Sequence, residues 1–134
     1  MDLVVDANII FAALIKDGVS SNILFNSNFT LFTPEFVIFE LEKHKEKILE
    51  YTNRPAHEFS RLLEILQRRI IHIPHFDLVN FVEEAEKITP DPDDMAYFAA
   101  ALKLNCAIWS NDKKLKEQNR IRIYHTHELS KLNE

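Results

Sequence analysis

"LVVDANIIFAALI", residues 3–15, contains a short apolar run, a single acid and then a longer apolar segment. The run over 3–5 ends in two β-branched valines, which favours a buried strand, whereas the segment over 7–15 has the length of a helix. Asp6 lies between them, where a carboxylate can cap the first turn of a helix by accepting backbone N–H bonds. The opening of the chain therefore predicts a strand that passes through one acid into a helix.

The rest of the chain repeats this alternation. Helical patterns separate further short apolar runs, which are predicted as strands over 29–33, 70–73, 106–110 and 121–125. The predicted helices cover 20–27, with Ser20 or Ser21 as N-cap, 34–50, with Pro34 at the first helical position, 55–69, 78–88, the segment from 91, 112–119 and 127–132. Continuous apolar runs suit strands covered on both faces, so we expect an α/β fold with a mainly parallel sheet of four to five strands. The strand-free stretch 34–69 is predicted to be an inserted helical hairpin.

Composition limits the class of protein. A chain of 134 residues with 46% hydrophobic and 28% charged residues is typical of one globular domain, so we expect a single domain over 1–134. No apolar run reaches the 18 or so residues of a membrane span, and the N-terminus lacks the basic start of a signal peptide. We therefore expect a cytoplasmic protein without a membrane partner.

Two rare residue types exclude several kinds of site. Gly18 is the only glycine, so neither the dinucleotide-binding G-x-G-x-x-G pattern nor a P-loop can be present. Cys106 is the only cysteine, which excludes an intramolecular disulfide and a Cys-based zinc cluster. Six histidines are present, but they form no H-E-x-x-H or Cys/His framework, and we expect no zinc site.

The net charge of -5 argues against a protein that holds nucleic acid by a large basic surface. It does not exclude a nuclease, because divalent cations bound to carboxylates reverse the local sign of the charge. Scattered basic residues could guide an RNA backbone, although solvated helix faces explain them at least as well; they are found in "KHKEK" (43–47), at Arg54, Arg61, Arg68 and Arg69, and from "DKKLK" (112–116) to Arg122.

Two acids are expected at the same edge of the sheet. Asp6 follows the first predicted strand, and Asp112 follows the strand in "AIWSND". Each acid taken alone is most simply a helix cap. Because parallel strands end at one edge, however, both carboxylates are expected to lie close together, where they repel unless a cation or a proton lies between them.

Glu40 is less expected than a capping acid. In the helix over 34–50 it lies about 40° from Phe36 and about 60° from Val37, on the side that should face the body of the protein. A glutamate there is costly unless it is paired or bound to a metal. The alternative is an edge position whose carboxylate reaches water, near Lys43, His44 or Lys47.

"DPDD", residues 91–94, begins a helix with three acids. Asp91 fits the N-cap and Pro92 the first helical position, so capping accounts for Asp91. Asp94 shares a helical face with Phe98 and is expected to point towards the sheet, whereas Asp93 is rotated away by about 100°. Small residues at 96 and 99–101 would let this helix approach the strands closely.

These acids come from four separate elements and could converge on one edge. Mg²⁺ and Mn²⁺ prefer oxygen ligands and keep several waters, which leaves room for a substrate phosphate. A divalent cation at such a site can activate water and stabilise charge on a phosphate ester. The sequence thus predicts a site made of Asp6, Glu40, Asp94 and Asp112.

At these residues the chain resembles the PIN-domain family, which includes the VapC-type toxins of prokaryotic toxin–antitoxin pairs. The resemblance covers nearly the whole chain, in "VVDANII" (4–10), "TPEFVIFELEKHKEKI" (33–48), "DPDDMAYFAAAL" (91–102) and "AIWSNDKKL" (107–115). It implies a three-layer α/β/α fold, dependence on Mg²⁺ or Mn²⁺, endoribonuclease activity on RNA, an antitoxin partner and a homodimer. The family's acids correspond to Asp6, Glu40, Asp94 and Asp112, and its polar helpers to Asn8 and Ser110.

The chain departs from the family pattern in two places. Ala7 stands where a threonine or serine often follows the first acid, which removes one possible hydrogen bond. The double acid Asp93 and Asp94 leaves open which of the two takes part in metal binding, and helical geometry favours Asp94.

The same residues bear on other enzyme classes with acidic pockets. Haloacid dehalogenase-type phosphatases need a second aspartate two residues after the first, where Asn8 stands. A response-regulator receiver needs an aspartate that ends a central strand, and the third strand is followed only by the more distant Asp77. An acidic-pocket phosphatase is therefore a minor alternative. A non-catalytic RNA-binding or scaffold module of the same fold is the other, which the loss of an acid would have favoured.

Overall fold

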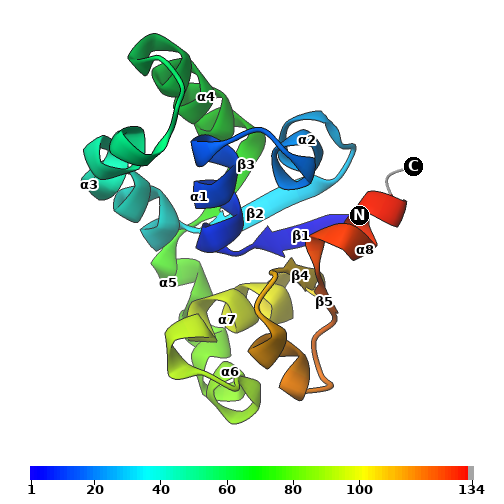
Figure 1. Ribbon diagram of the computed structural model, residues 1–134. Coiled ribbons are helices and arrows are strands. Elements are labelled where there is room, and N and C mark those ends of the chain that lie inside the picture. The colour runs from blue at the N-terminus through cyan, green and yellow to red at the C-terminus, as the bar shows by residue number, and fades with distance from the viewer. Residues whose placement is uncertain (133–134) are drawn as a thin grey trace.

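The computed structural model describes residues 1–132 and contains a five-stranded parallel sheet (Figure 1). The strands are arranged in the order β3-β2-β1-β4-β5, and every neighbouring pair is parallel. This confirms the predicted α/β class and the parallel sheet. The strand bounds are β1 Asp2–Val5, β2 Thr30–Pro34, β3 Ile70–Ile73, β4 Ala107–Trp109 and β5 Ile123–Tyr124.

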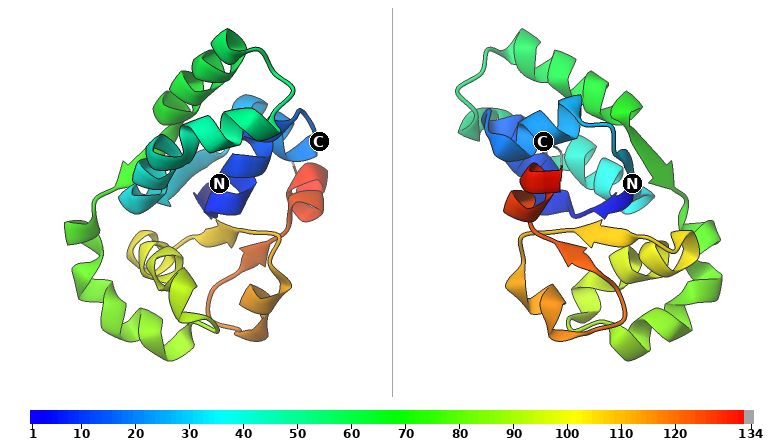
Figure 2. Two further views of the ribbon diagram at one scale, coloured as in Figure 1. Left: turned by 60° about the vertical axis from the view of Figure 1, so that its left-hand side comes forward. Right: turned by 90° about the vertical axis from the view of Figure 1, so that its right-hand side faces the viewer.

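Helices cover both faces of this sheet and make a three-layer arrangement (Figures 1 and 2). On one side lie α1 (Ala7–Ile15), α2 (Val19–Asn26) and α8 (Thr126–Leu132). On the other side lie α6 (Val82–Ile88) and α7 (Met95–Leu104). The sheet is therefore shielded from water on both faces, which explains the continuous apolarity of its strands.

The predicted helical hairpin is present between β2 and β3. It consists of α3 (Glu35–Tyr51) and α4 (Ala56–Arg69) and projects beyond the sheet (Figure 2). Arg54 lies in the connection and donates to the carbonyl oxygens of Ala13 and Leu14, with its side chain only 8% exposed. It therefore stabilises the end of α1 and fastens the hairpin to the body of the protein.

Several element boundaries differ from the sequence prediction. The N-cap of α2 is Gly18, because the Ser21 hydroxyl accepts the Gly18 N–H at 2.8 Å and bonds back to the Gly18 carbonyl. The expected serine cap was therefore wrong, and Pro34 is likewise the N-cap of α3 instead of its first helical residue. The helix expected over 78–88 is divided into α5 (His75–Leu78), the 3₁₀ turn η1 (Val79–Phe81) and α6.

The core is centred on α7 and β4. Phe98 and Trp109 are fully buried, and the Trp109 indole N–H donates to the Thr126 hydroxyl at 3.0 Å. The residues Ala99–Ala101 are also fully buried, which confirms that small side chains let α7 pack closely on the sheet. After α7, Asn105 takes the left-handed conformation with φ 51°, which ends the helix and turns the chain into β4.

Among the described residues, no single helix is both long and apolar enough to cross a membrane. Only α1 and α2 taken together reach the required length and composition, and they are bent by 105° at the break between them.

Candidate functional site

The strand order reverses at β1, and the candidate site lies at that point. The chain proceeds from β1 to β2 and β3 on one side, and later returns to place β4 and β5 on the other side. In sheets of this kind ligands bind beyond the carboxyl ends of the strands at such a switch point. Asp6 directly follows β1 and Asp112 follows β4, so both acids lie at this edge.

Asp6 is almost completely buried and is held by two hydrogen bonds. Its Oδ1 accepts the backbone N–H of Asn8 at 3.1 Å, which caps α1. Its Oδ2 accepts the Ser110 hydroxyl at 2.7 Å. Capping and a position in the site are therefore compatible, because one carboxylate oxygen serves the helix and the other faces the neighbouring strand.

Ser110 connects the first acid to the last. Its fully buried hydroxyl donates to Asp6 and accepts the backbone N–H of Asp112 at 3.1 Å. Asp112 itself is exposed, and its Oδ1 accepts the Lys114 N–H at 3.0 Å at the start of the 3₁₀ turn η3 (Lys113–Glu117). The loop after β4 is thereby fixed relative to β1.

The "DPDD" run forms a short 3₁₀ turn, η2 (Pro92–Asp94), before α7 begins at Met95. Asp91 caps this turn, since its Oδ1 accepts the Asp93 N–H at 3.0 Å. Asp93 is exposed, whereas Asp94 is half-buried. The Lys114 ammonium lies 3.7 Å from Asp91 Oδ2, so an ion pair spans the two acid-bearing segments.

The electrostatics of Asp94 locate it beside the other acids. Partial burial and the negative charges of Asp6, Asp91, Asp112 and Asp93, in that order, raise the pKa of Asp94 to about 6. All of these causes act in the same direction. A half-buried carboxylate surrounded by other acids is more typical of a functional site than of a structural ion pair.

Tyr97 belongs to the same neighbourhood, although its apolar sequence context predicts only a core position. Its hydroxyl accepts the Ala7 N–H at 3.1 Å, and burial raises its pKa, with the charges of Asp6 and Asp94 adding to the effect. Its ring lies 5.8 Å from that of Phe36 on α3. Tyr97 thus joins the beginnings of three helices at the site, and its position one turn after Asp94 was the signal available in the sequence.

Glu40 has a different environment from the three aspartates. Its side chain is 46% exposed, and its Oε2 lies 3.1 Å from Nε2 of His44, one turn further along α3. It is not among the groups that shift the pKa of Asp94. The charges of Asp6 and Asp112 thus act on Asp94, whereas Glu40 is paired with a histidine.

The cluster supplies the right kind of ligand for a hard cation. Carboxylate oxygens are the donors that Mg²⁺ and Mn²⁺ prefer, and the charges of the neighbouring aspartates add to burial in raising the pKa of Asp94. Within residues 1–132, no three Asp, Glu, His or Cys side chains are grouped so that they could already hold a metal ion. The carboxylates are therefore suitable ligands for a divalent cation, but in the described residues they are not arranged to coordinate one directly.

Comparison with known families identifies the fold. The family model described as PIN domain matches residues 4–129. The chain belongs to the PIN-domain family. Among solved structures, it is similar to a chain in the VapBC2 complex from Rickettsia felis bound to a DNA fragment from its promoter, with a TM-score of 0.64 and 19% identity. The match covers 93% of this chain and 98% of that chain, and it confirms the PIN-like architecture. Comparison with curated protein sequences gave no significant match.

Proposed function

We propose that this PIN domain is a metal-dependent endoribonuclease that hydrolyses RNA phosphodiester bonds. The observation that carries the proposal is the group of Asp6, Asp94 and Asp112 at the switch point, where burial and then the charges of neighbouring aspartates, Asp6 first, raise the pKa of Asp94 to about 6. Membership of a family whose proteins are typically nucleases supports the same assignment. The cluster is too acidic to receive a phosphodiester by itself, so a divalent cation is required.

The cation would be Mg²⁺ or Mn²⁺, held by Asp6, Asp94 and Asp112. When bound, it supplies Lewis acidity that activates water and stabilises charge at the phosphate. Ser110 keeps Asp6 and Asp112 in register through its two hydrogen bonds. Tyr97 holds the start of α7 against the start of α1, and so keeps Asp94 beside Asp6.

Glu40 is assigned as a further ligand or an orienting acid. In its present position the carboxylate bonds to His44, so its contribution would require it to exchange this partner for a cation or a water molecule. Asn8 and Asp93 both have exposed side chains near the aspartates and would contact water or substrate. Asp93 is the weaker candidate of the two acids at the start of α7, because it is the more exposed.

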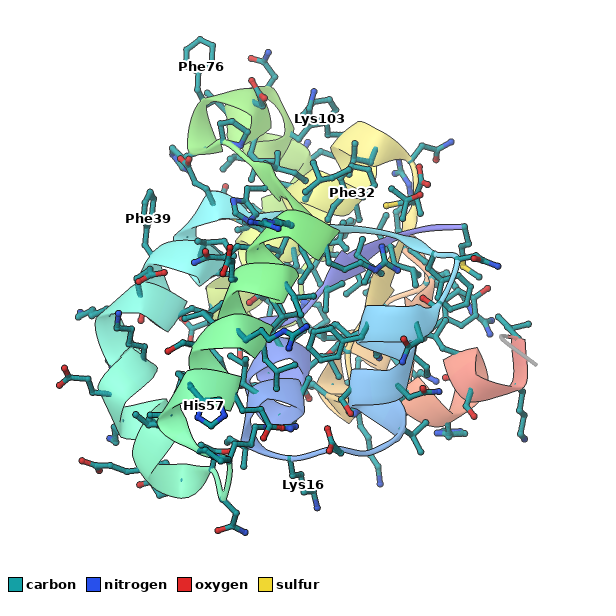
Figure 3. All side chains as sticks on the ribbon, turned by 90° about the horizontal axis from the view of Figure 1, so that it is seen from above. Lys16, Phe32, Phe39, His57, Phe76 and Lys103 are labelled. Atoms are coloured by element: carbon teal, nitrogen blue, oxygen red, sulfur yellow. The ribbon has the colours of Figure 1, made fainter. Side chains whose placement is uncertain are left out.

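A protein partner is also proposed. The similar VapBC2 structure is a toxin–antitoxin complex, and we assign this chain the role of the toxin in such a pair, acting as a homodimer. Phe39 and Phe76 support a protein contact, because they are 65% and 85% exposed and project from the surface (Figure 3). Large apolar side chains in such positions are typical of interaction surfaces.

The test is cleavage of a labelled single-stranded RNA by purified protein in the presence of Mn²⁺. Wild type should cleave, and Asp6→Asn and Asp94→Asn should not, because each removes a charge needed to hold the cation. Asp77→Asn is a matched control, since Asp77 is an exposed aspartate on α5, outside the cluster. Equal cleavage by all four proteins, or cleavage that survives a chelator, would reject the proposal.

A further inference from the structure

An open hollow of about 800 Å³ lies beside the acid cluster, between α1, α2, α8 and the loop after β4. Its lining includes Asn111 and Lys113, which flank Asp112 in the sequence. It also includes Ala12 and Lys16, which continue the face of α1 that begins at Asn8, because residues four apart share a face of a helix. The hollow therefore adjoins the segment that carries Asp112, and its lining on α1 extends from Ala12 to the C-cap Lys16, about 6 Å at 1.5 Å per residue.

The charge of this hollow is opposite to that of the whole chain. Its lining contains Lys16, Lys113 and Lys131, and within residues 1–132 it contains no Asp or Glu. None of these lysines forms an ion pair with another described residue. The hollow is therefore locally basic, although the whole chain has a net charge of -5.

The other basic residues nearby are already engaged. Lys114 pairs with Asp91 and Lys116 with Glu128, whereas the guanidinium groups of Arg120 and Arg122 lie 2.7 and 3.4 Å from carboxylates. In the basic run over 112–122, Lys113 is the only cation that forms no ion pair with another residue of 1–132, and it lines the hollow. The structure thus distinguishes the Lys and Arg side chains that are already paired with carboxylates from Lys113, which the sequence could not do.

The walls of the hollow are held together before any ligand binds. Asn111 Oδ1 accepts the Thr126 N–H at 2.8 Å, which ties the loop after β4 to α8. The hydroxyls of Ser20 and Thr126 lie 3.1 Å apart and connect α2 to α8. A preformed site loses less conformational entropy when it binds a ligand.

We propose that this hollow binds the single-stranded RNA on one side of the cleaved phosphate, with Lys16, Lys113 and Lys131 contacting backbone phosphates. Lysines without carboxylate partners suit a polyanion, and they offer no complement to a basic protein segment. His127 is exposed on the same lining, 5.9 Å from His125, and its ring provides a surface on which a base can stack. This assignment rests on the proposed ribonuclease function and names the path of its substrate.

The test separates binding from cleavage. Binding of a short fluorescein-labelled single-stranded RNA is measured by fluorescence anisotropy, in chelator, over a series of salt concentrations. The triple variant Lys16→Gln, Lys113→Gln, Lys131→Gln should bind more weakly, by roughly two- to fivefold per lysine. The slope of log Kobs against log salt should flatten by about 0.7 for each phosphate that a lysine no longer neutralises, hence by about 2 for the triple variant.

The control removes the same number of charges elsewhere. Lys45, Lys87 and Lys103 lie outside the hollow, and Figure 3 shows Lys103 and Lys16 on opposite sides of the molecule. Their triple substitution to glutamine should leave the slope within about 0.5 of wild type. Equal slopes for both triple variants, or no salt-dependent binding by wild type, would overturn the assignment.

Two further outcomes are distinguishable. If the triple variant lost binding to a protein partner but bound RNA as wild type does, the hollow would be assigned to that partner and the RNA assignment would be overturned. Salt-dependent binding through the three lysines, without any cleavage by wild type in Mn²⁺, would support the hollow as an RNA site while rejecting the ribonuclease proposal.

Discussion

Asp94 and Glu128 are carboxylates of the same chain whose surroundings shift their pKa values in opposite directions. Burial and neighbouring acids raise the pKa of Asp94 to about 6, whereas bonds from Lys116 and from the His125 N–H lower that of Glu128 to about 2. Glu128 is satisfied by the protein itself, with Lys116 Nζ at 2.6 Å. Asp94 is not, and an acid that the fold leaves unsatisfied is the one that needs an external cation or a proton.

The largest expected difference between these two acids concerns activity. Asp94→Asn should reduce RNA cleavage in Mn²⁺ by roughly 10²-fold or more, because it removes a charge that holds the cation. Glu128→Gln should stay within about twofold of wild type, since Glu128 bonds to basic groups away from the aspartates. Cleavage rates at saturating RNA check both values. A similar loss of RNA cleavage in the two variants would show that the difference in pKa between Asp94 and Glu128 is unrelated to activity.

The stabilisation of the protein by a metal ion should depend on the acid cluster and not on acids elsewhere. A cation that binds only the native state stabilises it by about 2.7 kcal/mol at a concentration of 100 Kd. Mn²⁺ should therefore raise the Tm of wild type and of Glu128→Gln by several degrees, and leave the double variant Asp6→Asn, Asp94→Asn unchanged. Differential scanning fluorimetry measures this. An equal shift in the double variant would place the cation elsewhere.

Glu128 should contribute stability that depends on pH in the opposite sense to Asp94. Its folded pKa is depressed to about 2 from 4.5, so its contribution is present above pH 4.5 and is lost as the pH falls towards 2. Glu128→Gln should cost about 1 kcal/mol at pH 7, after allowance for solvent screening. Urea unfolding of the two proteins at pH 7 and pH 3 tests this, and a difference that grows on acidification would contradict it.

The smallest expected effect is on the stability of the metal-free cluster. Because the folded pKa of Asp94 is raised from 3.8 to about 6, its contribution to stability is fully present below pH 3.8 and is lost as the pH rises through 6. In chelator, Asp94→Asn should therefore be more stable than wild type at pH 7, by up to about 1 kcal/mol. Asp77→Asn should not be. Urea midpoints at pH 4 and pH 7 measure the effect, and a destabilised Asp94→Asn at pH 7 would contradict the repulsion.

Much of the fold could be predicted because apolar runs and helical periodicity are local signals. The strand over 70–73 was predicted with the bounds that the structure gives, and the parallel sheet followed from the alternation of elements. The cap of α2 could not be predicted, because Gly18 acts there through the Ser21 hydroxyl instead of through a side chain of its own. The break of the helix over 78–88 likewise has no glycine or proline to mark it.

The sequence predicts the positions of some residues of the candidate site better than those of others, for a physical reason. Acids that follow strands, such as Asp6 and Asp112, are located by the sheet, so their convergence could be inferred from the order of the elements. The environment of Glu40 depends on whether its carboxylate meets the aspartates or His44, and helical phase alone could not decide between them. The apolar sequence context of Tyr97 predicts a core position, and its ring is indeed buried; its hydrogen bond to Ala7 is a tertiary contact that a sequence pattern does not contain.

The most direct test of the cation site is the anomalous scattering of Mn²⁺ in a crystal of the protein soaked in that ion. We expect a peak among the carboxylates of Asp6, Asp94 and Asp112, with oxygen atoms at about 2.0–2.3 Å. A peak at another group of acids, or none among these three at saturating Mn²⁺, would contradict it.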